Sequence, residues 1–238
     1  VVPVFTAKRL AEGVDGELAT TIKNLQKRGD IEGKIGDSLL LPVAVGVAAE
    51  RVLLVGAGSG ELSANQWRKL AETIAKQAKQ CKAKSVATAL CELTVAERSC
   101  QWQCEQLACV LANSTYAYDT TLSEKKTNHL QELTLLTCAD KQASCAADLA
   151  NGVAIAAGMA LTRELGNLPP NLCHPSYLAE QARALAKAHK NLKVDILDEK
   201  KLKELGAGAF LAVAQGSEQP PRMIVLHYNG GKKNAAPH

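Results

Sequence analysis

Three glycines within five residues form the clearest candidate for a phosphate-binding loop. The stretch Gly56-Ala57-Gly58-Ser59-Gly60 follows an apolar segment and precedes a helix start. A loop at such a position can hold a phosphate on exposed backbone N–H groups. However, Glu61 stands where the dinucleotide-binding fingerprint needs its third glycine, and no phosphate-binding lysine follows. We therefore expect a tight structural turn, with no nucleotide affinity tighter than about millimolar.

The histidines and acidic residues do not form a familiar catalytic pattern. No histidine is spaced from a second metal ligand as in an HExxH zinc site, and there is no GxSxG nucleophile elbow. Asp195, Asp198 and Glu199 form a small acidic group at an expected strand end and helix start, where such residues commonly cap helices. The residues alone therefore assign no catalytic, cofactor-binding or metal-binding position. The histidines are His129, His174, His189, His227 and His238.

Eight cysteines raise the question of disulfides or a soft-metal site. The chain has enough apolar residues to form a core without disulfides, and it contains no CxxC pair. Cys100 and Cys104 lie four residues apart on an expected helix, a spacing that suits two ligands of one ion. A small buried hydrophobic side chain is the commoner role of cysteine. We expect eight reduced thiols, no bound zinc and a reducing, cytosolic environment.

Composition and charge are those of an ordinary soluble globular protein. Hydrophobic residues make up 47% of the chain, and no apolar run approaches the length that spans a bilayer, so no membrane partner is expected. The formal net charge is +4, but the lysines are scattered as on solvated helix faces, so nucleic acid is not indicated as a partner. Because the chain opens on Val1 and not on Met, a cleaved targeting segment upstream stays an open alternative.

Short apolar stretches alternate with helical patterns along the chain, which predicts an α/β fold. Most of these stretches are rich in Val, Leu and Ile without strict alternation, as in strands that are covered on both faces. The expected strands are Val1–Phe5, Ser38–Val43, Arg51–Val55, Ser85–Leu90, Leu133–Thr137, Lys193–Leu197, Phe210–Ala214 and Met223–Tyr228.

Five helices are expected between these strands. The strongest begins at Ser63, which can form a capping box with Gln66 and is followed by an apolar stripe that starts at Trp67. The others span residues 94–116, 141–165, 175–190 and 198–205. On the helix over 141–165, Gly152 and Gly158 lower helix propensity, so we expect both to pack closely against a neighbour. Its expected apolar face is Ala146, Leu149, Ala150, Val153, Ala154 and Ala157.

Pro169 and Pro170 mark the end of that long helix. Two successive prolines remove two backbone donors and push Leu168 out of helical geometry. We therefore place a domain junction here. The predicted organisation is a first domain over 1–148, a linker helix over 149–168 and a second domain over 169–238.

Two longer stretches are more specific than any of these fragments. The first, Thr162–Ala182, contains Gly-Asn-Leu-Pro-Pro-Asn, and the second, Leu205–Gly230, contains Ala-Gln-Gly-Ser-Glu-Gln-Pro-Pro-Arg. Both are similar, nearly position by position, to the opening of the catalytic domain of the leucyl aminopeptidases, a two-metal peptidase family. The upstream stretches Gly29–Leu41 and Arg51–Gly56 resemble the amino-terminal domain of that family more loosely.

The resemblance implies a fold, an activity and a cofactor. The implied fold is a macro-domain-like amino-terminal domain with a mixed sheet between helices, then a linker helix and the first part of an α/β catalytic domain. The implied protein is a cytoplasmic homohexamer that removes amino-terminal residues from peptides, favouring leucine, with two zinc or manganese ions that activate a water. In the family, the metal-binding lysine and carboxylates begin shortly after the position of Gly231. We expect this chain to lack that segment and to be inactive alone, so no site residue is carried over.

Two alternatives from other classes stay open. The glycine loop could belong to a macro-like module that binds a nucleotide or ADP-ribose, and stabilisation by ADP-ribose would favour this function. A scaffold role associated with DNA is the second alternative, and salt-sensitive retention on DNA would favour it.

Overall fold

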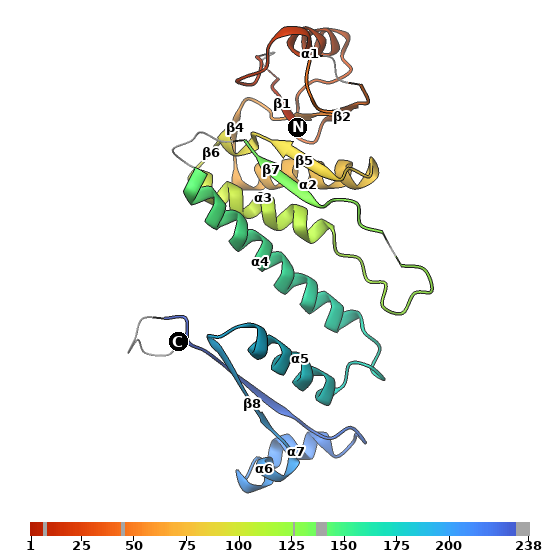
Figure 1. The fold of residues 1–238 in the computed structure, drawn as a ribbon, viewed down its shortest axis with the longest axis vertical. Helices are drawn as coiled ribbons and strands as arrows, with labels where there is room; N and C mark the ends of the chain where they lie inside the picture. Colours follow the sequence, from red (N-terminus) through yellow and green to blue (C-terminus); the bar gives the residue numbers. More distant parts are fainter. Residues whose placement is uncertain (7–8, 44–45, 126, 137–141, 232–238) are drawn as a thin grey trace. The chain divides into compact units, whose positions relative to one another are not determined.

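The computed structural model describes residues 1–6, 9–43, 46–125, 127–136 and 142–231 (Figure 1). Thr137, Cys138, Lys141 and His238, which belong to features expected above, lie outside these ranges. The chain divides into two compact units, Val1–Glu164 and Leu165–His238. This division falls between the domain limits expected at 148 and 168, and those limits stay a prediction.

A mixed sheet forms the centre of the first unit. Its middle strand β3 pairs in parallel with β1 and antiparallel with β2. The parallel pair β5–β7 continues beside β1, where the Val1 nitrogen donates to the Ala87 carbonyl oxygen at 2.6 Å. The short strands β4 and β6 form a separate parallel pair. The strands are β1 (Val2–Val4), β2 (Ser38–Leu41), β3 (Val52–Gly56), β4 (Glu61–Leu62), β5 (Ser85–Thr88), β6 (Thr94–Val95) and β7 (Glu132–Leu135).

Side chains that alternate along β3 supply a core on each face of this sheet. Leu54 packs in a cluster with residues of α1 (Gly16–Arg28), and Val55 packs in a larger cluster with α2 (Ala64–Gln80) and α3 (Cys100–Ser114). Figure 1 shows α1 on one side of these strands and α2 with α3 on the other. The predicted arrangement of a mixed sheet between helices is therefore confirmed.

The helix predicted to start after Ser63 is confirmed together with its capping box. The Gln66 N–H donates to the Ser63 hydroxyl, and the Ser63 N–H donates to the Gln66 side-chain oxygen at 2.9 Å. The two reciprocal bonds satisfy donors that a helix start otherwise leaves open. Behind the cap, Trp67 is fully buried, and its ring lies 5.6 Å from that of Trp102 on α3.

Three expectations about secondary structure were wrong or incomplete. α3 begins at Cys100 and not near Thr94, because Ser99 caps it and Thr94–Val95 is strand β6. Phe210–Ala214 is not a strand but lies in α7 (Gly208–Ala214), since a short apolar run does not itself distinguish strand from helix. Helix α1 was not predicted, although Leu18, Ile22 and Leu25 recur at helical spacing among polar residues.

The long helix α4 (Gln142–Asn167) buries a different face from the one expected. Cys145, Gly152 and Ala156 are buried, whereas Val153 is 53% exposed. Alanines occur all round this helix, so its sequence does not distinguish one apolar face from another. The close packing predicted at Gly152 is confirmed, because a Cβ there would lie 2.1 Å from the Glu105 carbonyl oxygen of α3. At Gly158 it was wrong, since a Cβ would meet none of the described atoms within 4 Å.

One stretch of α4, Cys145–Asn167, is long and apolar enough to cross a membrane by length and composition alone. No such stretch was expected from the sequence, and that expectation was wrong. Small apolar residues spread along the whole helix raise its average hydropathy without forming an uninterrupted run. One face of the same helix packs on α3, as a helix of a globular protein would.

The second unit has a thin core. The antiparallel pair β8 (Leu192–Leu197) and β9 (Met223–Tyr228) packs against α5 (Pro175–Ala188) and α6 (Glu199–Glu204). Among the described residues after Glu164, four hydrophobic side chains are buried. By contrast, Val213 on α7 is 87% exposed and Tyr228 on β9 is 73% exposed. The buried set is Leu168, Ala179, Ala182 and Leu202.

Candidate functional site

The acidic residues of the second unit do not converge on a common point. Asp195 lies 3.2 Å from His227, Asp198 accepts the Lys201 N–H as the cap of α6, and Glu199 pairs with Lys203 at 2.7 Å. The backbone hydrogen bond from Lys201 lowers the pKa of Asp198, as expected for a helix cap. Two bridged divalent ions need several carboxylates fixed on one rigid surface. The acidic residues described in this unit therefore do not fit a two-metal site.

The Pro169-Pro170 stretch forms the turn that was predicted between α4 and α5. α4 ends at Asn167, and the Pro169 carbonyl oxygen accepts N–H groups from both Leu172 and Cys173 at 2.9 Å. Pro175 then occupies the first turn of α5, where a missing N–H costs nothing. This turn positions the start of the second unit and presents no catalytic side chain of its own.

The glycine loop is a structural turn, and four of its five backbone donors are already used. Gly56 is glycine because a Cβ there would lie 1.9 Å from the Lys34 carbonyl oxygen, and Gly58 has a left-handed backbone with φ +61°. The following helix start is occupied by the Ser63–Gln66 capping box. A phosphate would therefore have to displace existing hydrogen bonds. The loop donors and their carbonyl acceptors are Gly56 to Asp37, Ala57 to Val4, Gly58 to Gly33 and Gly60 to Ala57.

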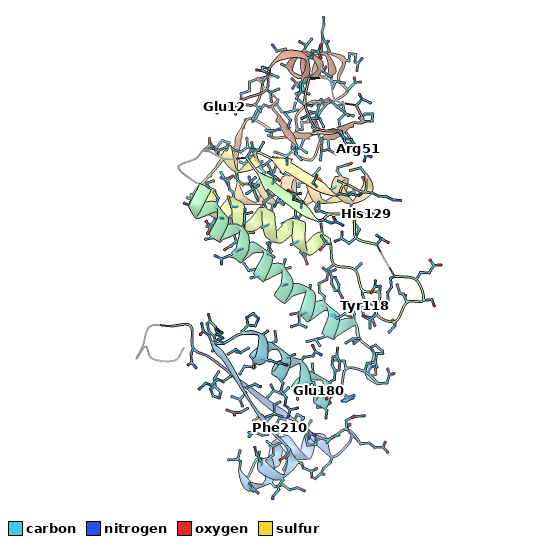
Figure 2. The ribbon with its side chains drawn as sticks, viewed as in Figure 1. Glu12, Arg51, Tyr118, His129, Glu180 and Phe210 are labelled. Carbon is cyan, nitrogen blue, oxygen red and sulfur yellow. The ribbon has the colours of Figure 1, made fainter. Side chains whose placement is uncertain are left out.

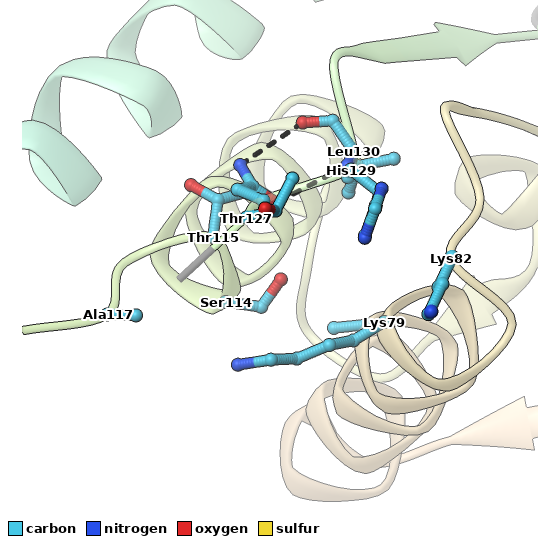
Figure 3. Close-up of a pocket in the computed structure, with 10 residues that line it drawn as sticks. Lys79, Lys82, Ser114, Thr115, Ala117, Thr127, His129 and Leu130 are labelled. Carbon is cyan, nitrogen blue, oxygen red and sulfur yellow. Dashed lines mark hydrogen bonds between the residues drawn. The ribbon is translucent and has the colours of Figure 1, made fainter. Parts of the chain in front are cut away.

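A cavity of about 230 Å³ in the first unit has a basic and hydroxyl-bearing lining (Figure 3). Lys79 and Lys82 come from the end of α2 and the turn after it, and His129 comes from the segment that precedes β7. Ser114 and Thr115 add hydroxyls from the end of α3. The lining contains no carboxylate, so it suits an anion better than a divalent metal ion.

The structure brings none of the described histidines into a metal-ligand set. His129 lines the basic cavity and is labelled in Figure 2, His174 and His189 flank α5, and His227 faces Asp195. His238 lies outside the described residues.

Three cysteines, in contrast, do come together. Cys145 at the start of α4 joins Cys100 and Cys104 of α3, and their sulfur atoms all lie within 4.8 Å of one another. In the part of the chain that the structure describes, this is the one group of three or more metal-ligating side chains at such distances. Spacing along α3 suggested the first two ligands. The third is distant in sequence, and no local pattern pointed to it.

Comparison with known proteins supports the resemblance seen in the two longer stretches. Residues 1–125 match the family model described as the cytosol aminopeptidase family, N-terminal domain. Residues 160–238 match the model of the same family's catalytic domain. The two matches follow one another in the order expected for a single polypeptide.

Individual relatives agree with these models. A cytosol aminopeptidase of Pseudomonas aeruginosa is 51% identical over 232 residues, which cover 96% of this chain and 46% of the relative. A probable cytosol aminopeptidase of Azotobacter vinelandii is 51% identical over 235 residues, covering 98% of this chain and 46% of the relative. The chain thus spans about half the length of the curated relatives it matches.

Two solved structures share the fold. A mutant leucine aminopeptidase from tomato superposes with a TM-score of 0.73 at 25% identity, over 97% of this chain and 48% of its own. The bottromycin maturation enzyme BotP, solved in complex with Mn, superposes with a TM-score of 0.69 at 25% identity, over 92% of this chain and 43% of its own.

Proposed function

The chain belongs to the cytosol aminopeptidase family, and on this basis we propose that it is the amino-terminal domain, linker helix and first catalytic-domain part of a metal-dependent aminopeptidase. The observation that carries the proposal is the succession of both family models along one chain, with relatives 51% identical across nearly all of it. The complete protein would hydrolyse the first peptide bond of peptides, with leucine favoured at the amino terminus.

The complete protein would use two divalent ions, zinc or manganese. A related enzyme was solved in complex with Mn, which supports this choice. The described residues of this chain do not fit such a pair of ions, because Asp195, Asp198 and Glu199 each serve a local contact. These 238 residues are accordingly proposed to be inactive by themselves.

The role proposed for this chain is therefore to support the catalytic centre. The thin core of the second unit leaves large apolar side chains exposed, among them Leu205 at 68% and Leu226 at 49%. We propose that the remainder of the catalytic domain covers this surface and that the complete protein forms a homohexamer in the cytoplasm.

The two alternatives receive no support from the described residues. A nucleotide or ADP-ribose site at Gly56–Gly60 conflicts with the use of its N–H groups in backbone hydrogen bonds. A role with DNA needs a clustered basic surface, whereas the lysines of this chain are scattered. Our proposal therefore includes no nucleic acid, and it includes no membrane.

The proposal is tested by assaying the complete protein on a panel of dipeptides that differ in their amino-terminal residue. We expect release of the amino-terminal residue, fastest for leucine, that a chelator abolishes and that added manganese or zinc restores. Cleavage within longer peptides, or activity that survives chelation, would contradict the proposed function.

A further inference from the structure

The cysteine cluster of the first unit has no role in the proposed aminopeptidase reaction. It combines Cys100 and Cys104, one turn apart on α3, with Cys145 at the start of α4. The sulfur atoms of Cys100 and Cys145 are 3.7 Å apart. Cys91 of the 3-10 turn Leu90–Glu92 lies next to Cys104, since its interaction with Cys104 raises the pKa of that thiol, but its sulfur is not within 4.8 Å of all three. Three thiols from two helices therefore meet, and a fourth thiol lies beside Cys104.

These distances are those of ligands that share one metal ion. At a Zn–S distance of about 2.3 Å, two sulfur ligands of a tetrahedral ion lie about 3.8 Å apart, and those of a trigonal ion about 4.0 Å apart. The Cys100–Cys145 separation of 3.7 Å matches the tetrahedral value. The other two sulfur pairs lie within 4.8 Å and so exceed that value by about 1 Å at most.

The surroundings favour a thiophilic ion in a structural role. Cys91, Cys104 and Cys145 are all at most 3% exposed, whereas Cys100 is half-buried and offers a path from solvent. Thiolate ligands select soft ions such as Zn²⁺ and Cu⁺ over Mg²⁺, Ca²⁺ and Mn²⁺. A mostly buried set with a fourth thiol available leaves no open position for substrate, which is the pattern of structural and not of catalytic zinc.

Without a bound cation, the surroundings of these thiols favour the protonated form. Burial, and then the hydrogen bond with Cys145, raise the pKa of Cys100 to about 12. The hydrogen bond with Cys91, and then burial, raise the pKa of Cys104. Thiols packed against one another disfavour each other's ionisation, and a bound cation reverses this preference because it stabilises every thiolate around it.

We propose that Cys100, Cys104 and Cys145, with Cys91 as the fourth ligand, bind one thiophilic metal ion, and this proposal replaces the expectation from the sequence that no zinc is bound. The ion fastens the first turn of α4 to α3 and to the 3-10 turn beneath it. Because it binds the folded first unit and not the unfolded chain in this geometry, it raises the stability of that unit. This site is separate from the metal pair of the proposed aminopeptidase, whose ligands are not thiols, and it does not depend on that function.

Cobalt substitution tests the proposal, because a thiolate-to-cobalt charge-transfer band arises only from cobalt bound by sulfur. The purified protein, stripped of metal and kept reduced under anaerobic conditions, is titrated with Co²⁺ and then with Zn²⁺. We expect the band to saturate at one Co²⁺ per chain and to be displaced by one Zn²⁺. We also expect Zn²⁺ to raise the Tm of the first unit.

Serine variants locate the site. C104S and C145S should lose the band and the rise in Tm, while C81S and C173S, whose cysteines lie outside the cluster, should keep both. Because C104S removes a buried thiol and could misfold, C100S at the half-buried position is the second variant, and it should weaken the band in a protein with unchanged circular dichroism. Absence of the band in the wild-type protein, or a band of unchanged intensity in folded C100S and C145S, would overturn the proposal.

Discussion

Replacing Gly152 with alanine should loosen the contact between α4 and α3. The added Cβ would lie 2.1 Å from the Glu105 carbonyl oxygen and 2.8 Å from the Ala108 Cβ, whereas ordinary contacts begin near 3.4 Å. The helices must therefore separate by about 1 Å, because the nearest atom is backbone and cannot rotate away. Overpacking of this kind costs about 1–3 kcal/mol, and alanine regains about 1 kcal/mol of helix propensity. We expect a net loss of up to about 2 kcal/mol for G152A.

Gly158 on the same helix provides the matched control. A Cβ there would meet none of the described atoms within 4 Å, so G158A should gain the helix propensity without the clash. We expect G158A to be more stable than the wild type by about 0.5–1 kcal/mol. The two variants should then differ by the overpacking cost, about 1–3 kcal/mol.

Urea unfolding followed by tryptophan fluorescence measures this difference. The chain has two tryptophans, Trp67 and Trp102, and both lie in the first unit, so their signal reports the unfolding of that unit. If G152A is as stable as G158A, the close approach of α4 to α3 at Gly152 is wrong.

Three further predictions concern other parts of the chain. S63A should destabilise the first unit by about 1 kcal/mol through loss of the cap, while S59A at an exposed loop position should not. The same tryptophan fluorescence transition measures both variants, and equal effects would argue against the capping box. L202A should destabilise the second unit by about 2–5 kcal/mol, which should appear as faster amide hydrogen exchange in β8 and α6. The tryptophan transition of the first unit should not move, and a shift of that transition in L202A would mean that the two units do not unfold separately. Calorimetry with ATP, NAD and ADP-ribose should show no binding tighter than about millimolar, and micromolar binding would revive the nucleotide alternative.

Elements with strong local signals were predictable from the sequence. α2 combines a capping box with an apolar stripe that starts at Trp67, and the structure has both. β3 is a short run of branched apolar residues, and every residue in it is buried, as expected for a strand between two helical layers. The turn at Pro169 followed from the geometry of proline alone.

Features that depend on tertiary packing were not predictable in the same way. α4 is rich in alanine all round, so only its contact with α3 decides that Gly152 and Ala156 face inward and Val153 outward. The short run Phe210–Ala214 was ambiguous between strand and helix until its neighbours placed it in α7. The cysteine cluster depends on a contact between Cys100 and Cys145, and nothing in the spacing along α3 indicates Cys145.

The proposed catalytic function was predictable only through resemblance. Two specific stretches indicated the family, but the acidic residues in the second unit are engaged in caps and ion pairs. No reasoning from local chemistry could have assigned peptidase activity to these residues.

The most direct test of the central claim compares two purified chains on leucine p-nitroanilide with manganese. One chain has these 238 residues, and the other continues through the remainder of the family's catalytic domain. We predict no turnover by the shorter chain at any manganese concentration, and metal-dependent release of p-nitroaniline by the longer one. Turnover by the shorter chain that persists after removal of contaminating peptidases would mean that these residues hold a complete active site, which would contradict the proposed role.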